Sequence, residues 1–185
     1  MIIYKKYNWE FSKKNILEKV YKNKLLIKEI SGNTSYNTDE IMFFCEEFDS
    51  IKNFIITEYF NIKKIDKTDY AFNMWSYIQN KNSTTPDYRW HTHKNLDGGR
   101  TELQTDYTFV FYLQIPINLK KGEGDLLIRD ENGIVNRIVP LEGDIIFFKG
   151  NLSHVPENTP NAEIDRVVIA GNISSDFICN KKNVI

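Results

Sequence analysis

Histidine and cysteine are scarce in this sequence, and their scarcity limits the kinds of site that it can form. The 2 cysteines, Cys45 and Cys179, lie far apart and form no C-x-x-C motif. The first residues, MIIYKKYNWEF, contain lysine and asparagine too early to form the apolar core of a signal peptide. We therefore expect a reduced, cytoplasmic protein. Because only 3 histidines occur in 185 residues, their positions are informative.

Long apolar runs and an excess of charge of one sign are absent as well. No uninterrupted apolar segment approaches the ~20 residues of a membrane-spanning helix, so we expect no membrane insertion. The chain has 24 basic and 25 acidic residues, a formal net charge of -1. A nearly neutral protein has no overall field that attracts nucleic acid or an anionic membrane, so we expect neither as a partner.

The first third of the chain has the periodicity of helices. Between residues 38 and 64, apolar residues recur at three- and four-residue steps, and Thr38 supplies an N-terminal cap followed by acidic residues. This pattern predicts one long helix. A shorter helix is predicted from the candidate cap Ser12 to Tyr21.

From Asp69 onward, short aromatic and β-branched runs alternate with turn residues, which is typical of strands. The runs are YAFNMWSYIQ, YTFVFYLQIP, GDLLIRD, GIVNRIVP, GDIIFFKG and RVVIAGNIS. Asn132-Gly133 separates two of them and predicts a hairpin turn. Many short strands after a helical segment predict a mainly β fold with N-terminal helices, either a sandwich or a closed jelly roll.

The length and the 41% hydrophobic content suit one well-buried core, so we expect a single structural domain. Within it we predict an N-terminal helical elaboration (1–68), a β core (69–178) and a C-terminal tail (179–185). No internal repeat or long linker interrupts this organisation.

The histidines lie in a pattern that suits a metal ion. In the stretch RWHTHKN, His91 and His93 are two residues apart, and residues at this spacing point to the same face of an extended chain. His154 follows the apolar run GDIIFFKG, at a position that a barrel can bring beside an earlier strand. Neutral imidazole is the commonest ligand for iron, zinc, nickel and copper. We therefore predict a metal site formed by His91, His93 and His154.

A single arginine forms the second candidate site. Arg166 begins the run RVVIAGNIS, with Val168 and Ala170 on the same strand face. Burying a guanidinium is costly unless it meets an anion, and its planar fork matches a carboxylate. The alternative is an edge arginine paired with Asp165 or Glu163.

Four segments in order, WHTHKN, FVFYLQIP, EGDIIFFKGNLSHVPEN and RVVIAGNIS, resemble the 2-oxoglutarate and Fe(II)-dependent oxygenase superfamily. The resemblance is to its small prolyl-hydroxylase-like members in bacteria and bacteriophages, and it covers residues 72–174. It implies a double-stranded β-helix, which is a jelly roll of the cupin type, behind N-terminal helices. It also implies Fe(II) and 2-oxoglutarate as cofactors.

The resemblance assigns roles to individual residues. His91 and His154 match the first and last iron ligands, and Arg166 matches the basic residue that binds the distal carboxylate of 2-oxoglutarate. Tyr112 and Thr108, on one face of a strand, match partners of the same co-substrate.

His93 departs from the superfamily pattern, because most members carry Asp or Glu at this position, although some small relatives look similar in carrying H-x-H. Three neutral ligands would leave the metal with a higher net charge, which favours anionic co-ligands. The alternative third ligand is Asp97, in HKNLDGG.

The resemblance implies hydroxylation of an unidentified small molecule or protein side chain. Two alternatives remain open. One is a three-histidine cupin dioxygenase that needs no 2-oxoglutarate. The other is a non-enzymatic jelly-roll module in a larger assembly, such as a phage virion, which would place the protein in a virion or a host cytoplasm.

The segments on either side of the histidine pair, 80–89 and 95–106, are rich in turn residues. We interpret them either as loops that cover a substrate or as plain surface connections. Aromatic residues near these segments, Trp75, Tyr77, Trp90 and Tyr112, are candidates for the lining of the site.

Overall fold

The computed structural model describes residues 1–8, 13–22, 27–29, 32–34, 46–84, 90–94 and 104–175. The elements are β1 (Ile2–Lys6), α1 (Lys13–Lys22), β2 (Ile27–Glu29), β3 (Gly32–Thr34), α2 (Glu46–Lys63), β4 (Ala71–Gln79), β5 (Tyr107–Gln114), β6 (Leu126–Arg129), β7 (Val135–Ile138), β8 (Asp144–Lys149), β9 (Ser153–Pro156) and β10 (Arg166–Ser174). In this part of the chain, neither helix has the length and apolar character needed to cross a bilayer.

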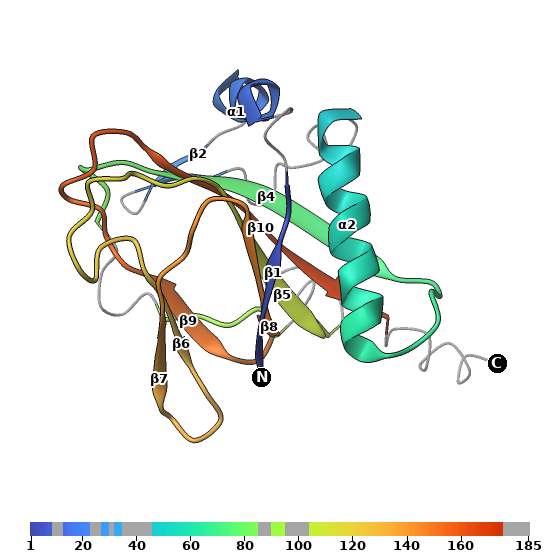
Figure 1. The fold of residues 1–185 in the computed structure, drawn as a ribbon. Helices are drawn as coiled ribbons and strands as arrows, with labels where there is room; N and C mark the ends of the chain where they lie inside the picture. Colours follow the sequence, from blue (N-terminus) through green and yellow to red (C-terminus); the bar gives the residue numbers. More distant parts are fainter. Residues whose placement is uncertain are drawn as a thin grey trace.

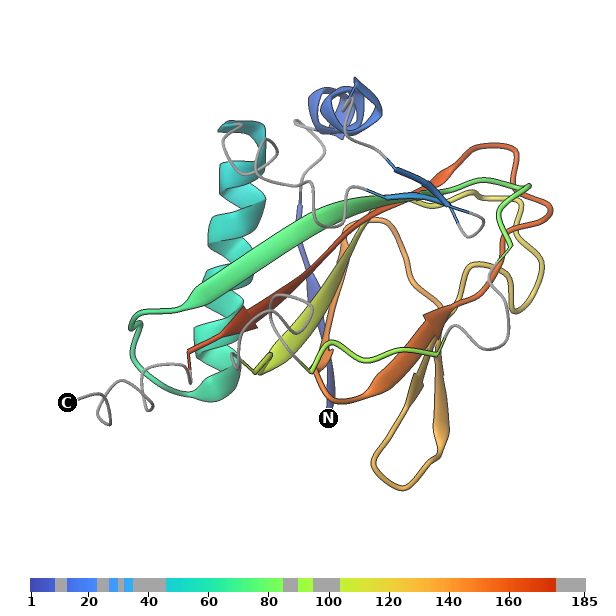
Figure 2. The ribbon, with the colours of Figure 1, turned by 180° about the vertical axis from the view of Figure 1, so that it is seen from behind.

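The strands form two antiparallel sheets that face each other. The large sheet has the order β1-β8-β5-β10-β4-β3-β2, and the small sheet has the order β7-β6-β9. Figures 1 and 2 show both helices on one side of the large sheet and the β6–β7 hairpin projecting on the other side. This arrangement is the double-stranded β-helix expected from the sequence.

Successive side chains of the central strands point to opposite faces of the large sheet, so the sheet has a separate hydrophobic core on each face. On β5, Phe109 and Phe111 point toward the helices, whereas Val110 and Tyr112 point toward the small sheet. The second set belongs to a cluster between the sheets, here called the inner core. Its buried members are Val110, Tyr112, Leu126, Ile128, Ile138, Ile146, Phe148, Leu152 and Val168. Burial on both faces explains why these strands contain apolar residues on both faces and not on one alone.

Most elements lie where the sequence predicts them. The shorter helix is confirmed as α1, although Ser12 lies outside the described residues. The longer helix is confirmed as α2 from Glu46, and its predicted first turns with Thr38 lie outside the described residues. The hairpin turn between β6 and β7 is also confirmed, with Gly133 at a φ of 81°.

The N-terminal third contains strands that the helical prediction missed. Ile2 pairs with Phe148 and Lys6 with Asp144, so β1 extends the large sheet beside β8. Five residues are too few to show a periodicity in sequence, and their partners lie far along the chain. The segment 1–68 is therefore not purely helical.

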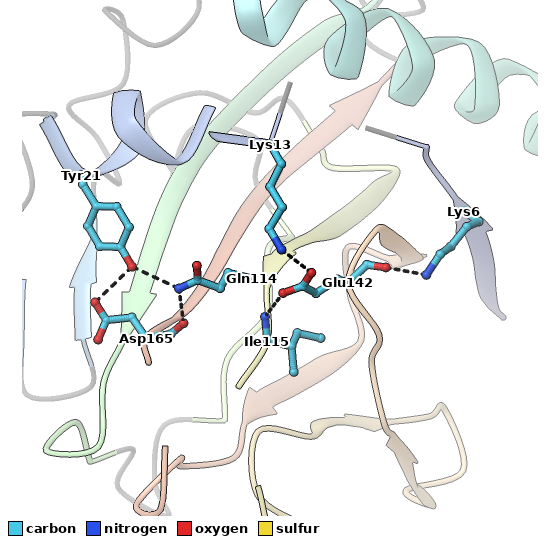
Figure 3. Close-up of polar contacts among 7 residues, drawn as sticks. All are labelled: Lys6, Lys13, Tyr21, Gln114, Ile115, Glu142 and Asp165. Atoms are coloured by element: carbon cyan, nitrogen blue, oxygen red, sulfur yellow. Dashed lines mark hydrogen bonds and ion pairs between the residues drawn. The ribbon is translucent and has the colours of Figure 1, made fainter. Parts of the chain in front are cut away.

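Polar contacts join this N-terminal segment to the turn before β8 (Figure 3). The carboxylate of Glu142 accepts hydrogen bonds from the Lys13 ammonium and from the Ile115 backbone N–H, the latter at 3.0 Å. The Lys6 ammonium donates to the Glu142 backbone carbonyl. The main-chain N–H of Ile115 thus gains a partner just after β5 ends.

Asp106, just before β5, joins helix α2 to the end of β8. Its carboxylate lies 2.5 Å from Lys63 Nζ on α2 and 2.9 Å from Lys149 Nζ at the end of β8. The Tyr59 hydroxyl donates to it at 3.0 Å. Burial alone would raise the pKa of the Asp106 carboxyl, but the hydrogen bonds and charges of the two lysines outweigh burial and lower it.

We expect Asp106→Asn to reduce the free energy of unfolding by roughly 1–3 kcal/mol near neutral pH, because both lysines lose their charged partner. Since the folded-state pKa is lowered, this contribution is present above the unfolded pKa of about 4 and is lost as pH falls through the folded value. The difference between variant and wild type should therefore shrink at about pH 3 in urea unfolding.

Glu18→Gln is the matched control, because Glu18 pairs with Lys22 on an exposed helix surface. Its effect should stay within about 0.5 kcal/mol. An Asp106→Asn effect equally small at neutral pH would show that this ion-pair cluster does not stabilise the fold.

Candidate active site

The three histidines meet at one end of the inner core. Their ligand nitrogens all lie within 4.8 Å of one another, a spacing that could hold a metal ion. His91 forms an antiparallel bridge with His154, donating its backbone N–H at 3.2 Å and accepting the N–H of His154 at 2.9 Å. The structure thus brings together the three residues that the sequence singled out.

His93 is held by a neighbouring turn. Its backbone N–H donates to the Gly150 carbonyl at 2.8 Å. A Cβ on Gly150 would lie 2.8 Å from the Thr105 carbonyl oxygen, so only glycine allows the chain segments to approach this closely. The main-chain position of His93 therefore depends on the packing of residues 105 and 150.

The buried ring of His154 has a defined orientation. Its Nδ1 lies 3.2 Å from the Leu152 carbonyl oxygen. Because a carbonyl only accepts, Nδ1 carries the proton and Nε2 keeps the lone pair that a metal requires. Burial, and then the proximity of His91 and His93, lowers the pKa of His154 well below its ordinary value, so the ring is neutral.

His93 is also neutral under ordinary conditions. Burial, and then the proximity of His91, lowers its pKa to about 3. Its ring stacks on Trp75, with ring centroids 5.3 Å apart and planes 7° apart. Among the described residues, no carboxylate belongs to the histidine group. The alternative ligand Asp97 lies outside the described residues.

Arg166 lies inside the barrel with 2% of its surface exposed. Its Nη1 donates to the Gly124 carbonyl at 2.7 Å, whereas its Nε is buried without a hydrogen-bond partner. Burial lowers the pKa of the guanidinium. In the described part of the chain no carboxylate pairs with it, so the predicted alternative of pairing with Asp165 or Glu163 is wrong.

Asp165 is engaged elsewhere, as Figure 3 shows. Its carboxylate accepts a hydrogen bond from the Tyr21 hydroxyl at 3.2 Å, and its carbonyl accepts one from Gln114 Nε2 at 2.8 Å. Gln114 also donates to the Tyr21 hydroxyl at 3.3 Å. These contacts hold the residue before Arg166 on the outer side, toward α1.

Tyr112 and Thr108 share the inner face of β5 but lie at different ends of the site. Tyr112 pairs with Val168, two residues from Arg166, and burial raises the pKa of its phenol, which therefore stays protonated. Thr108 lies about 13 Å further along the strand, and its hydroxyl donates to Asn172 Oδ1 at 3.1 Å. Only Tyr112 is therefore close to Arg166.

Two residues near Arg166, Gly124 and Thr159, could not be identified as part of the site from the sequence. A Cβ on Gly124 would lie 3.3 Å from Thr159 Cγ2 and 3.9 Å from Arg166 Cδ, so these residues surround one small volume. Thr159 Oγ1 is buried without a hydrogen-bond partner. A glycine in a turn and a threonine in a loop are too common for sequence alone to identify them.

The donor set fits a transition metal and a separate anion. Neutral imidazoles are ligands for iron, zinc, copper and nickel. The buried Nε of Arg166, with its N–H unpaired, fits a carboxylate oxygen. Both groups lie on the inner face of the same barrel.

No family model and no curated protein matches the sequence. Structures of other proteins match in fold. A prolyl-4-hydroxylase from Pseudomonas putida superposes with a TM-score of 0.64 and 14% identity, over 93% of this chain and 91% of that chain. HygX from Streptomyces hygroscopicus, with nickel and 2-oxoglutarate bound, gives a TM-score of 0.66 and 8% identity, over 95% and 83%.

A third structure is a prolyl hydroxylase from Trichoplax adhaerens in complex with a hypoxia inducible factor peptide fragment. It gives a TM-score of 0.60 and 12% identity, over 93% of this chain and 82% of that chain. At such low identity the likeness establishes the fold alone. It confirms the double-stranded β-helix.

The lowered pKa values of His93 and His154 predict a weak pH dependence of metal binding. Two of three ligands need no deprotonation, so binding releases at most one proton. The Co(II) affinity should fall by no more than about tenfold per pH unit between about pH 6 and 5. Titrations followed by cobalt absorbance measure this slope, with circular dichroism confirming the fold. A fall of about a thousandfold per unit, the limit for three protonated histidines, would show that the pKa values of His93 and His154 are not lowered.

Proposed function

We propose that the protein is an Fe(II) and 2-oxoglutarate-dependent oxygenase that hydroxylates a C–H bond of a small molecule or a protein side chain. The observation that carries this proposal is the pairing of His91, His93 and His154 with a buried Arg166 inside one barrel. When bound, Fe(II) and 2-oxoglutarate would supply the oxidising chemistry together with molecular oxygen, of which one atom goes to the succinate formed with carbon dioxide from 2-oxoglutarate and the other to the new hydroxyl group of the substrate. The nickel and 2-oxoglutarate in HygX support the choice of cofactors for this fold.

Arg166 would bind the distal carboxylate of the co-substrate. The Gly124 carbonyl already occupies a donor at Nη1, so the edge of the guanidinium that contains Nε remains for an anion. A buried guanidinium without a counter-charge is costly, which favours binding of a negatively charged ligand. The protonated phenol of Tyr112, on the neighbouring strand, would serve as a further donor near this position.

The inner core would keep water from the reacting atoms. Phe148 packs against His154, with ring centroids 4.7 Å apart. Ile128 on β6 is the cross-strand partner of His154 on β9. Ile128 and Phe148 are fully buried. An apolar wall beside the metal ligands limits side reactions with solvent and strengthens electrostatic interactions at the site.

The three-histidine donor set also favours a second candidate, a dioxygenase that uses no 2-oxoglutarate. Such an enzyme would have no use for an arginine whose unpaired Nε is buried inside the barrel. The same residue argues against a purely structural jelly roll, because an apolar side chain of similar volume would fill that place at a lower cost. The buried Arg166 therefore favours the 2-oxoglutarate-dependent oxygenase over the other two candidate functions.

The test is an anaerobic Fe(II) titration with and without 2-oxoglutarate. We expect the weak visible charge-transfer band of a keto acid chelated to iron. His91→Ala should abolish the band, because it removes a metal ligand. Arg166→Ala should weaken 2-oxoglutarate binding by about 100-fold or more while iron still binds, since it removes a buried charged partner.

Arg129→Ala is the matched control, because the exposed Arg129 stacks on Trp90 and forms no ion pair among the described residues. It should leave the band unchanged. Iron binding without the band would favour the three-histidine dioxygenase. Failure to bind any metal would favour a structural protein.

A further inference from the structure

The orientation of His93 has a different physical basis from that of His154. His154 is fixed by the Leu152 carbonyl, which is the usual way in which a ligating histidine is oriented. Neither ring nitrogen of His93 forms a hydrogen bond with a described residue. Its backbone is held by Gly150, but that contact leaves the side-chain torsions undetermined.

Among the described residues, Trp75 on β4 is the aromatic ring most nearly parallel to His93; the ring of His154, with its centroid 5.0 Å from that of His93, is inclined by 27°. The indole is 6% exposed and lies opposite Ala170, whose small side chain leaves room on the inner face. The two rings are 7° from parallel, with centroids 5.3 Å apart, which is an offset stack. Any rotation of the imidazole about its χ2 torsion other than a half turn would break this parallel contact, so the stack fixes the plane of the ring.

This contact also bears on the identity of the residue at position 93. An imidazole has an aromatic face that can lie against an indole, whereas a carboxylate would place negative charge near the negative face of the indole. The indole of Trp75 therefore favours histidine at position 93 over the acidic residue found in most of the superfamily that the sequence resembles.

We propose that Trp75 is a positioning residue that holds the His93 ring by stacking and thereby makes it the third metal ligand. This inference rests on the metal site of the proposed function. Trp75 would not touch the metal itself and would act only through His93. The expected cost of losing the stack is modest, since aromatic pairs of this kind contribute a factor of about 2 to 12 in an equilibrium constant.

The test measures Co(II) affinity and the Co(II) visible spectrum in variants of the full chain, without 2-oxoglutarate. Trp75→Leu should weaken Co(II) binding by about tenfold and shift the visible bands, because the plane of the His93 ring is no longer held. Trp75→Phe keeps an aromatic face and should stay within about threefold of wild type. In a His93→Ala background, Trp75→Leu should have no further effect, because the contact is already gone.

Phe72→Leu is the matched control. Phe72 also lies on β4 but on the helix side, where it stacks on Phe109 with centroids 5.5 Å apart and planes 16° apart. Its substitution should lower thermal stability and leave Co(II) affinity and spectrum unchanged. If Trp75→Leu does not fold, Trp75→Met, which retains more of the buried volume, should show the same loss and spectral shift.

The outcomes separate this inference from the proposed function. If wild type binds Co(II) and forms the iron charge-transfer band, but Trp75→Leu and Trp75→Met match wild type in affinity and spectrum, the inference is wrong and the oxygenase proposal stands. An equal loss in the His93→Ala background overturns the inference too, because Trp75 would then act independently of His93. If wild type binds no metal, both fail.

Discussion

Burial of the large sheet on both faces is the constraint on which the rest of the structure depends. Strands β5, β8 and β10 are buried in nearly every position, so each face needs a cover. The helices cover one face, and the small sheet covers the other. Of the candidate site, His154 and Arg166 are buried on the second face beside the inner core, whereas His93 is half-buried and His91 is exposed. The buried part of this site is shielded from solvent because the fold must be closed there in any case.

Electrostatically, the two halves of this site are unlike. At the histidine end, the rings of His93 and His154 are neutral, whereas Arg166 brings a buried positive charge at the other end. A divalent metal would make both ends positive. A dianion that reaches from one end to the other would neutralise this interior, which is the electrostatic argument for a dicarboxylic co-substrate. With a carboxylate at position 93, the metal end would be less positive.

Local periodicity was sufficient to identify the main elements and most of the candidate site. The common face of His91 and His93 and the inward face of Arg166 follow from alternation, and the strand-end position of His154 follows from the apolar run before it. The structure shows the three histidines together and Arg166 buried. Features that depend on residues far apart in sequence could not be predicted. These include the pairing of β1 with β8 and the parallel stack on His93. The environment of Arg166 also required the folded chain, because Gly124 approaches it from a separate turn.

The position of β10 has a consequence for folding. This strand lies between β4 and β5, although it follows both in the sequence, so β4 and β5 have no direct pairing with each other. Until residues 166–174 are inserted, the centre of the large sheet is a gap with two unpaired strand edges. Such non-local pairing slows folding and exposes edges that can recruit other chains. The segment that contributes Arg166 is therefore also the one whose arrival completes the sheet, so a chain that exposes this gap would be prone to aggregation.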